Sequence, residues 1–308
     1  MSSTRIKVGI RPPHEVLESG AETLRSVIGK IEALGIDHVC VGDHVTFKGG
    51  RGYDGLVQST AIGAVSTSID VHTAVYLLPL RHPVPVARQV MSLAQLTGGR
   101  FVFGIGLGGD DRTEYLACGV DPATRGKRMD ESLDLVRRLM TGAPVTHQGR
   151  FFELNDVTMV PVPERPVPIV VGGRADATVH RVARNGDGWL GVFVSAQRFT
   201  QMTAQITDAA AAIGRTEVDW RHGVHIWCGF GASAEAAQPA LAEVLEGLYR
   251  QPFSNFERYA PHGTPDDVAG ALAPFVEAGC RSFNLSPVSR DLDEALESVA
   301  AVRTLLNA

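Results

Sequence analysis

Short apolar runs alternate with longer amphipathic segments along almost the whole chain. The runs are rich in β-branched residues, as strands are, whereas the segments between them repeat apolar residues every three or four positions, as helices do. This alternation predicts parallel β-α-β units. Eight strands are expected, at Ile6–Ile10, His38–Val41, Val71–Leu77, Phe101–Ile105, Pro168–Val171, Gly188–Val192, Gly223–Cys228 and Arg281–Leu285.

The helices between these strands carry their own start and stop signals. The segment Ala21–Leu34 has one apolar face and is followed by Gly35, a residue that favours the left-handed turn at a helix end. Thr264 and Pro265 are typical of an N-cap and a first helical residue, and Gly279 predicts the end of that helix. The last β-α unit is therefore well delimited.

Most of the predicted strands are apolar without alternation, which is typical of strands covered on both faces. Eight such units in 308 residues predict an α/β protein with a (β/α)8 TIM barrel fold. The rhythm breaks at residues 141–165 and 250–263, which we expect to be loop insertions in the barrel. We therefore expect a single domain over residues 1–308.

Composition and charge exclude several classes of partner. The net charge is -5 and the 29 basic residues are scattered, which argues against binding to nucleic acid. The first residues lack the apolar core of an export signal, and no stretch reaches the roughly 20 apolar residues of a membrane span. The four cysteines are far apart and mostly lie in apolar runs, which indicates buried reduced thiols. We expect a cytoplasmic protein without a membrane partner.

Hydrolase chemistry finds little support in the sequence. The histidines closest to each other in a strand-like run, His222 and His225, would point to opposite faces, so no metal site is expected. There is also no G-x-S-x-G motif for a serine nucleophile.

Two ionisable residues, Asp43 and His44, directly follow the second predicted strand. In a barrel, the carboxyl ends of the strands form the face that carries the active site. At the end of an arbitrary strand, the aspartate would cap a loop and the histidine would be an ordinary surface residue. The barrel context favours a catalytic role.

The segment Phe101–Gly109, FVFGIGLGG, matches the dinucleotide-binding pattern G-x-G-x-x-G after a strand. That motif should open a helix at once in the first unit of a fold, but three units precede it here and the next clear helix is expected only near Thr124. We interpret it as a turn whose bare backbone approaches a ligand. A bulge or tight packing at the barrel rim is the alternative.

A second glycine-rich turn, Pro168–Ala175, leads from a predicted strand into a helix that starts at Asp176. A glycine pair in this position leaves amide N–H groups pointing at one spot, with the helix dipole behind them. Arg174 adds a cationic donor. The turn predicts a phosphate site, and an ordinary turn without a ligand is the alternative.

The chain resembles the bacterial luciferase-like superfamily, especially its F420-dependent branch. Four blocks in order carry the resemblance, beginning with the GDH strand end and covering GGRFVFGIGLGG with EYLACGVDPATRGKRMDESLDLVRRL, then VPIVVGGRADATVHRVARNGDGWL and GTPDDVAGALAPFVEAGCRSFNL. The resemblance implies a TIM barrel whose mouth holds coenzyme F420, or FMN as the alternative. It also makes a homodimer plausible.

The resemblance further implies roles for individual residues. Asp43 and His44 are the implied catalytic pair, with Asp43 also holding the cofactor and His44 acting as acid or base. The peptide Ala74–Val75 occupies a position where family members often carry a non-proline cis peptide beneath the deazaflavin. The implied cofactor-binding residues are Asp43, Ala74, Val75, Leu77, Gly106, Leu107, Gly108, Gly172, Gly173, Arg174, Ala175 and Asp176.

One departure from the family bears on the substrate. Sugar-phosphate dehydrogenases of the family carry a glutamate where this chain has Gly109, followed by Asp110 and Asp111, which disfavours a sugar phosphate. We expect hydride transfer between deazaflavin and a small organic substrate, with His44 handling a proton. The alternatives are an FMNH2-dependent monooxygenase fed by a partner reductase, and a non-catalytic flavin or F420 carrier. Aromatic residues of three loops are candidates to line the substrate pocket: Phe47, Tyr53, Tyr115, Phe253, Phe256 and Tyr259.

Overall fold

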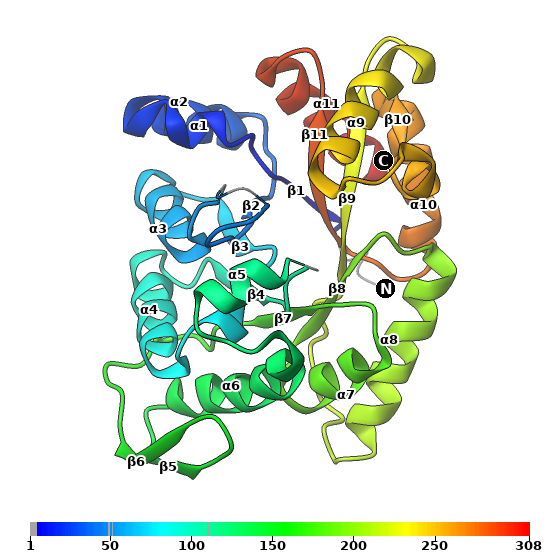
Figure 1. The fold of residues 1–308 in the computed structure, drawn as a ribbon. Helices are drawn as coiled ribbons and strands as arrows, with labels where there is room; N and C mark the ends of the chain where they lie inside the picture. Colours follow the sequence, from blue (N-terminus) through cyan, green and yellow to red (C-terminus); the bar gives the residue numbers. More distant parts are fainter. Residues whose placement is uncertain (1–4, 49, 51, 110) are drawn as a thin grey trace.

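Eight parallel strands close into a barrel in the computed structural model, which describes residues 5–48, 50, 52–109 and 111–308. Strand β8 pairs with β9, and β11 pairs with β1, so the sheet has no open end (Figure 1). The predicted (β/α)8 TIM barrel is confirmed. In barrel order the strands are β1 (Lys7–Ile10), β2 (His38–Val41), β3 (Asp70–Thr73), β4 (Phe101–Ile105), β7 (Ile169–Gly172), β8 (Gly188–Val192), β9 (Gly223–Phe230) and β11 (Ser282–Val288).

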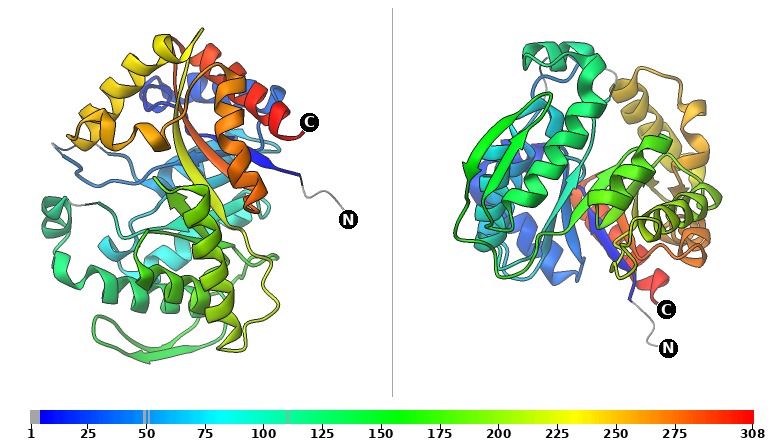
Figure 2. Two further views of the ribbon diagram at one scale, coloured as in Figure 1. Left: turned by 90° about the vertical axis from the view of Figure 1, so that its right-hand side faces the viewer. Right: turned by 90° about the horizontal axis from the view of Figure 1, so that it is seen from below.

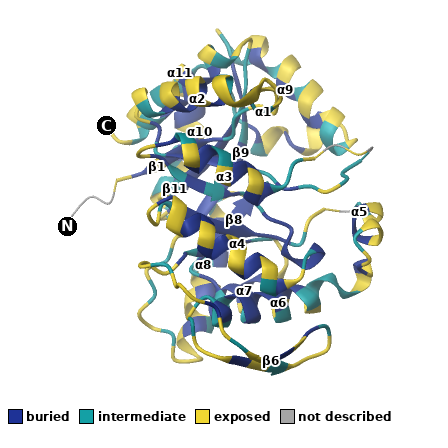
Figure 3. Ribbon diagram, turned by 90° about the vertical axis from the view of Figure 1, so that its left-hand side faces the viewer, coloured by how far each residue is buried: buried dark blue, intermediate teal, exposed yellow. Residues whose placement is uncertain are grey.

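Helices surround the barrel and connect successive strands (Figure 1). Their outer faces are exposed while the strands they cover are buried, as amphipathic periodicity requires (Figure 3). Within the part of the chain that the structure describes, no helix is both long and apolar enough to cross a membrane. The helices are α1 (Glu15–Glu18), α2 (Gly20–Ala33), α3 (Gly55–Val65), α4 (Pro83–Leu96), α5 (Arg112–Ala117), α6 (Arg125–Leu139), α7 (Asp176–Asn185), α8 (Ala196–Ala211), α9 (Ala234–Tyr249), α10 (Pro265–Glu277) and α11 (Leu292–Leu306).

The predicted helix boundaries follow from local chemistry. Gly35 and Gly279 have φ values of 69° and 91°, in the left-handed region that glycine adopts without steric cost. Thr264 and Asp267 form a reciprocal capping box at the start of α10, with Pro265 as its first residue. These residues delimit α2 and α10 as the sequence indicates.

Side chains of each strand alternate between two environments. Val224 and Ile226 of β9 pack in the large core between barrel and helices, so His225 between them faces the barrel interior. The interior also holds a small apolar cluster. All four cysteines are free; Cys40, Cys228 and Cys280 are buried and Cys118 is half-buried.

Residues 141–165 and 250–263 form local structure outside the eight-strand pattern. In the first, β5 (Val145–Gln148) and β6 (Glu153–Val157) make an antiparallel hairpin that lies outside the helices (Figure 2). In the second, two short 3-10 helices, Phe253–Asn255 and Glu257–Tyr259, precede β10 (His262–Gly263), which pairs with the end of β9.

Two boundary predictions were wrong. The helix after β4 was expected near Thr124, but α5 begins at Arg112, because the side chain of Asp111 caps it by accepting from the Thr113 amide at 3.0 Å. The third strand was expected to run to Leu77, but its regular pairing ends at Thr73. The chain then bulges, and its next pairing is an isolated bridge from Tyr76 to Ile105.

Candidate active site

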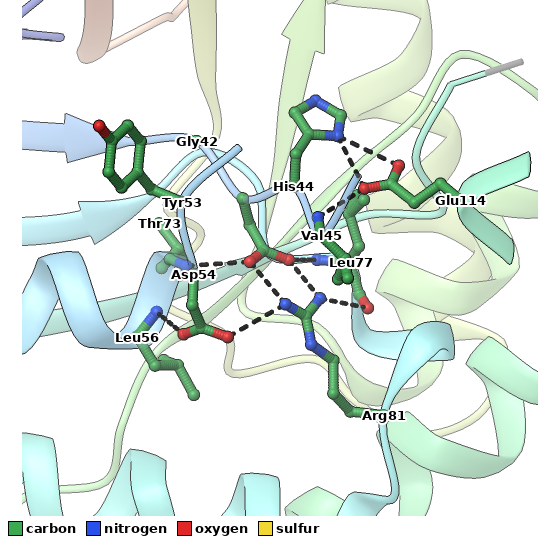
Figure 4. Close-up of polar contacts among 12 residues, drawn as sticks. Gly42, His44, Val45, Tyr53, Asp54, Leu56, Thr73, Leu77, Arg81 and Glu114 are labelled. Carbon is green, nitrogen blue, oxygen red and sulfur yellow. Dashed lines mark hydrogen bonds and ion pairs between the residues drawn. The ribbon is translucent and has the colours of Figure 1, made fainter. Parts of the chain in front are cut away.

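The predicted site residues follow the ends of β2, β3, β4 and β7, which are neighbours in the barrel. Because all four strands are parallel, these residues lie on one sector of the carboxyl-terminal face. The close-up of the β2 and β3 ends shows how His44 and its neighbours are held (Figure 4). Residue Asp110 lies outside the described residues.

Asp43 ties three segments of the site together from below. Its Oδ2 accepts from the amide of Leu77 at 2.8 Å, and its Oδ1 accepts from the amide of Gly55 at 2.9 Å. Arg81 donates to both oxygens, at 2.5 and 2.8 Å. The Asp43 side chain is 0% exposed. The Asp43 carboxylate thus holds the backbone of the site, with both oxygens engaged and buried. Its predicted contact with the cofactor stays a prediction.

Arg81, which the sequence reasoning did not single out, compensates this buried carboxylate. Its guanidinium also pairs with Asp54 at 3.1 Å (Figure 4). It stacks over the ring of Tyr76, 4.4 Å from the centroid. Burial raises the pKa of Asp43, and the charge and hydrogen bonds of Arg81 oppose that rise. Burial would also lower the pKa of Arg81, but Asp43 more than offsets this and the pKa is raised. We therefore treat the two groups as an ion pair.

The Ala74–Val75 peptide is cis, as the resemblance implied for this position. The Val75 side chain lies between two glycines: a Cβ on Gly106 would overlap its Cγ2, and one on Gly172 would lie 3.1 Å from its Cγ1. A Cβ on Gly104 would overlap the backbone oxygen of Thr73. These glycines therefore make room for the bulge after β3, which is the tight-packing interpretation of the FVFGIGLGG turn.

The loop after β4 continues along this bulge. Gly106 donates its amide to the carbonyl of Tyr76 at 2.9 Å, and Leu107 is half-buried. Gly108 has a φ of 82°, and a Cβ there would lie 3.2 Å from a methyl group of the buried Leu77. The glycines of this loop thus allow close packing on the segment after β3, and the contact of the loop with a ligand stays a prediction.

His44 is held by Glu114, a residue of α5. Its Nδ1 lies 3.2 and 3.3 Å from the two Glu114 oxygens, while Nε2 is directed away from them (Figure 4). Glu114 Oε1 also accepts from the amides of Val45 at 2.6 Å and Thr46 at 3.2 Å. The His44 side chain is 30% exposed and that of Glu114 is 2% exposed.

The environment keeps Glu114 ionised. Burial by itself would raise the pKa of Glu114, but hydrogen bonds from His44 and the Val45 amide outweigh it, and the pKa is lowered. A carboxylate against Nδ1 fixes the proton on that nitrogen and leaves Nε2 to accept or donate a proton. The sequence has Gly109 where sugar-phosphate dehydrogenases of the family carry a glutamate. In the structure, Glu114 supplies a carboxylate from five positions later, on helix α5, which was not predicted.

A second acid of the same helix region orders the rest of the β2 loop. Asp111 Oδ2 accepts from the amide of Lys48 at 2.7 Å, and the Phe47 ring stacks on His44 with centroids 4.2 Å apart. Of the aromatic residues predicted to line a pocket, Phe47, Tyr53 and Tyr259 are half-buried, whereas Tyr115, Phe253 and Phe256 are buried in apolar clusters.

The turn after β7 has the features of an anion site. Gly173 has a φ of 141°, and Trp189 donates its indole N–H to the Gly173 carbonyl at 2.7 Å. Ala175 is the N-cap of α7 and offers no side-chain cap, so the first amides of the helix are left for a ligand. Arg174 and Asp176 are exposed beside them, and Asp176 lies 3.4 Å from Arg198.

No group of three or more histidine, cysteine or acidic side chains suited to a metal ion occurs in the described ranges.

Comparison with known proteins connects these features to a family. The model of a family described as luciferase-like monooxygenase matches residues 5–282. The F420-dependent glucose-6-phosphate dehydrogenase of Kineococcus radiotolerans is 30% identical over 308 residues, covering 89% of each chain. The 4-hydroxyprotoasukamycin monooxygenase of Streptomyces nodosus subsp. asukaensis is 28% identical and covers 89% of this chain and 74% of its own. An uncharacterized protein of Mycobacterium tuberculosis is 44% identical over 135 residues, and this match spans about half of either chain, 44% and 46%.

Solved structures agree on the fold. An F420-dependent secondary alcohol dehydrogenase in complex with an F420-acetone adduct has a TM-score of 0.85 at 18% identity, covering 99% of this chain and 100% of its own. The oxygenating constituent of 3,6-diketocamphane monooxygenase from Pseudomonas putida, in complex with FMN, has a TM-score of 0.75 at 17% identity, covering 98% of each. At such identities the likeness concerns the fold alone.

Proposed function

This chain belongs to the luciferase-like monooxygenase family, and we propose that it is an oxidoreductase that uses coenzyme F420 to transfer a hydride to or from a small organic substrate. Two similarities support the choice of F420: the relative from Kineococcus radiotolerans and the alcohol dehydrogenase structure are both F420-dependent. Gly109 lacks the carboxylate that sugar-phosphate dehydrogenases of the family carry there, so we propose a substrate other than a sugar phosphate.

The observation that carries this proposal is the His44–Glu114 pair at the end of β2. Glu114 holds Nδ1 of His44, which leaves Nε2 as the proton donor or acceptor at the mouth of the barrel. An imidazole positioned in this way suits general acid–base catalysis. In this role His44 is the catalytic residue and Glu114 a positioning residue.

The residues present fit a phosphorylated, ring-bearing coenzyme. The uncapped first turn of α7 and the left-handed Gly173 form a cradle of amides for a phosphate, with Arg174 as a cationic partner. Val75, half-buried between Gly106 and Gly172, offers an apolar support for a flat ring. The amide cradle belongs to the backbone of the barrel, and Val75 is packed between two backbone positions, so these two features are preorganised.

The chain's own residues then divide the work. The coenzyme, when bound, supplies the hydride chemistry. The turn after β7 holds the phosphorylated tail, while the Asp43–Arg81 pair fixes the chain at Leu77 beneath the site. His44 moves the proton that accompanies the hydride. Orientation of coenzyme and substrate next to His44 is the protein's main contribution to the rate.

A reduced-FMN monooxygenase is the second candidate. It is supported by the 28% identical relative, which is a monooxygenase, and by the structural likeness to an FMN-bound oxygenating constituent. Such an enzyme would depend on a partner reductase for reduced flavin, whereas the F420 proposal does not. We also propose a cytoplasmic protein with one domain per chain and, as the resemblance implies, a homodimer. Sedimentation velocity tests the dimer.

The decisive experiment is a titration of the purified protein with F420 and with FMN, each in oxidised and reduced form, followed by coenzyme fluorescence or absorbance. We expect F420 to bind at least about 10-fold more tightly than FMN, a difference of about 1.4 kcal/mol. Tighter binding of reduced FMN than of F420, with oxygen consumption, would contradict the proposal and favour a reduced-FMN monooxygenase. Coenzyme binding without turnover on a panel of alcohols, ketones and enones would indicate a carrier.

A further inference from the structure

Arg11 directly follows β1 and places a guanidinium at the same mouth. Its amide donates to the carbonyl of Leu285 at 2.7 Å, which anchors it between β1 and β11. A Cβ on Gly42 would lie 2.9 Å from one guanidinium nitrogen, and the Trp227 ring centroid is 5.7 Å from Cζ. Trp227 lies on β9 two positions after His225, on the side that faces the barrel interior. The guanidinium therefore lies between the ends of β2 and β9.

The positive charge of Arg11 has no acidic partner within the described part of the chain. Its polar side-chain neighbour is His14, whose Nε2 lies 3.4 Å away. Other half-buried arginines are satisfied by oxygen: Arg81 and Arg137 pair with aspartates, and Arg100 donates to a carbonyl and a hydroxyl. A guanidinium cannot release its proton, and partial burial without an anion is unfavourable. Arg11 is thus prepared for an anion from outside the chain.

An aromatic wall stands next to this charge. Phe193, directly after β8, contacts Tyr249 and Phe256 with ring centroids 5.4 and 5.1 Å apart. Phe193, Tyr249 and Trp227 are half-buried and pack on a separate apolar cluster that includes Phe256. The φ of Phe193 is 51°, a region that non-glycine residues rarely adopt, so the surrounding packing holds this ring in place.

The charge of Arg11 also acts on two neighbouring groups, Tyr249 and His225. Burial raises the pKa of Tyr249, while a hydrogen bond with Trp227 and the positive charges of Arg11 and Arg174 oppose the rise. Burial, together with the charge of Arg11, lowers the pKa of His225 to about 3.

We propose that Arg11, Trp227, Tyr249 and Phe193 form the substrate site, and that the substrate carries a carboxylate on an aromatic or similarly flat apolar group. The proposal rests on the proposed function, because it names the substrate class of that same mouth. The carboxylate would bind the guanidinium through two parallel hydrogen bonds, and the apolar part would stack on the aromatic wall. Gly42, beside the guanidinium, is two residues before His44, so the carboxylate site and the proton donor both lie at the end of β2.

The backbone around Arg11 favours a carboxylate over a phosphate. The next two residues are Pro12 and Pro13, which have no amide N–H to donate. A phosphate has more oxygens to satisfy than one guanidinium can serve, and phosphate sites normally add a row of amides such as the one after β7. A carboxylate matches a single guanidinium fork.

The test measures binding of benzoate, benzamide and acetate to the full-length protein by calorimetry, without coenzyme, so it does not depend on the proposed hydride transfer. We expect benzoate to bind at least about 10-fold more tightly than either benzamide or acetate. Arg11→Gln should weaken benzoate about 10-fold or more and leave benzamide within about 2-fold, whereas Arg11→Lys should retain part of the affinity. Arg25→Gln, on the exposed side of α2, is the matched control and should change nothing.

Several results would overturn the proposal. Equal affinity for benzoate and benzamide, or an unchanged benzoate affinity in a folded Arg11→Gln protein, would show that Arg11 does not recognise a carboxylate. Equal affinity for benzoate and acetate, or an unchanged benzoate affinity in Trp227→Leu, would show that the aromatic residues do not bind the apolar part of the substrate. A parallel titration with F420 tests whether the anion that binds Arg11 belongs to the coenzyme. If Arg11→Gln weakens the affinity for F420 about 10-fold but leaves the affinity for benzoate unchanged, the guanidinium binds the coenzyme. Thermal unfolding of each variant shows whether it is folded.

Discussion

His44 Nδ1 and the Glu114 carboxylate lie 3.2 Å apart, although one residue follows β2 and the other belongs to α5. The same carboxylate also accepts from the amides of Val45 and Thr46, so it fixes both the ring and the backbone that carries it. This double contact makes Glu114 more than a partner in an exposed ion pair. It determines where Nε2 of His44 points.

Replacing Glu114 by Gln tests this relationship. The amide keeps the size of the side chain but loses the charge, and we expect kcat to fall about 10- to 100-fold while coenzyme affinity changes less than about 2-fold. The pH profile of kcat should change as well, because the carboxylate that fixes the proton on Nδ1 of His44 is lost.

A matched control exists elsewhere in the molecule. Glu131 of α6 contacts Nε2 of His147 at 3.1 Å and accepts from the amides of Phe151 and Phe152, a similar arrangement at the β5–β6 hairpin. Glu131→Gln should leave both kcat and its pH profile unchanged. If Glu114→Gln and Glu131→Gln behave alike, the role of Glu114 is merely structural.

Arg81→Met would leave Asp43 as a buried carboxylate without its countercharge. Removing one partner of a buried pair costs about 3–5 kcal/mol, so we expect a loss of that size in the free energy of unfolding, measured by urea denaturation. Arg290→Met, which breaks an exposed pair with Asp291, should cost less than about 1 kcal/mol. A loss below about 1 kcal/mol for Arg81→Met would contradict the structural role that we assign to Asp43.

Gly106→Ala tests the packing around the bulge after β3. The new methyl group would overlap Val75, and overpacking of this kind costs about 1–3 kcal/mol in the free energy of unfolding. Val75→Ala in the same protein should recover most of that loss, since the two sites are in contact and their effects are not additive. Gly270→Ala, in α10 with open space around it, should instead stabilise by up to about 1 kcal/mol. Additive effects of Gly106→Ala and Val75→Ala would show that the two residues do not compete for space.

Sequence patterns predicted the barrel because each β-α unit carries its own signals: apolar runs, a helix face, and punctuation such as Gly35 and Thr264. The site was predictable only as far as single loops reach. His44 and the turn at Gly173 are visible in the sequence, but Arg81 and Glu114 depend on contacts across 38 and 70 positions, which no local pattern encodes. The hydrogen-bond partners of Asp43 were not predictable for the same reason, since they are spread over three segments.

The last prediction concerns two histidines of the barrel interior, His38 and His225. Burial lowers the pKa of His38 to about 4, against a partial rise from its hydrogen bond with Asn284, and lowers that of His225 to about 3. In the unfolded chain both titrate near 6.5, so between about pH 6.5 and 4 the unfolded state binds more protons and stability falls as the pH falls. Each histidine should lower the free energy of unfolding by about 1–2 kcal/mol on going from pH 7 to pH 5, measured by urea denaturation across that range. His225→Gln should reduce the pH dependence of the free energy of unfolding by the contribution of one histidine, independently of how much it changes the stability at pH 7. An unchanged pH dependence would show that His225 is not buried as a neutral ring.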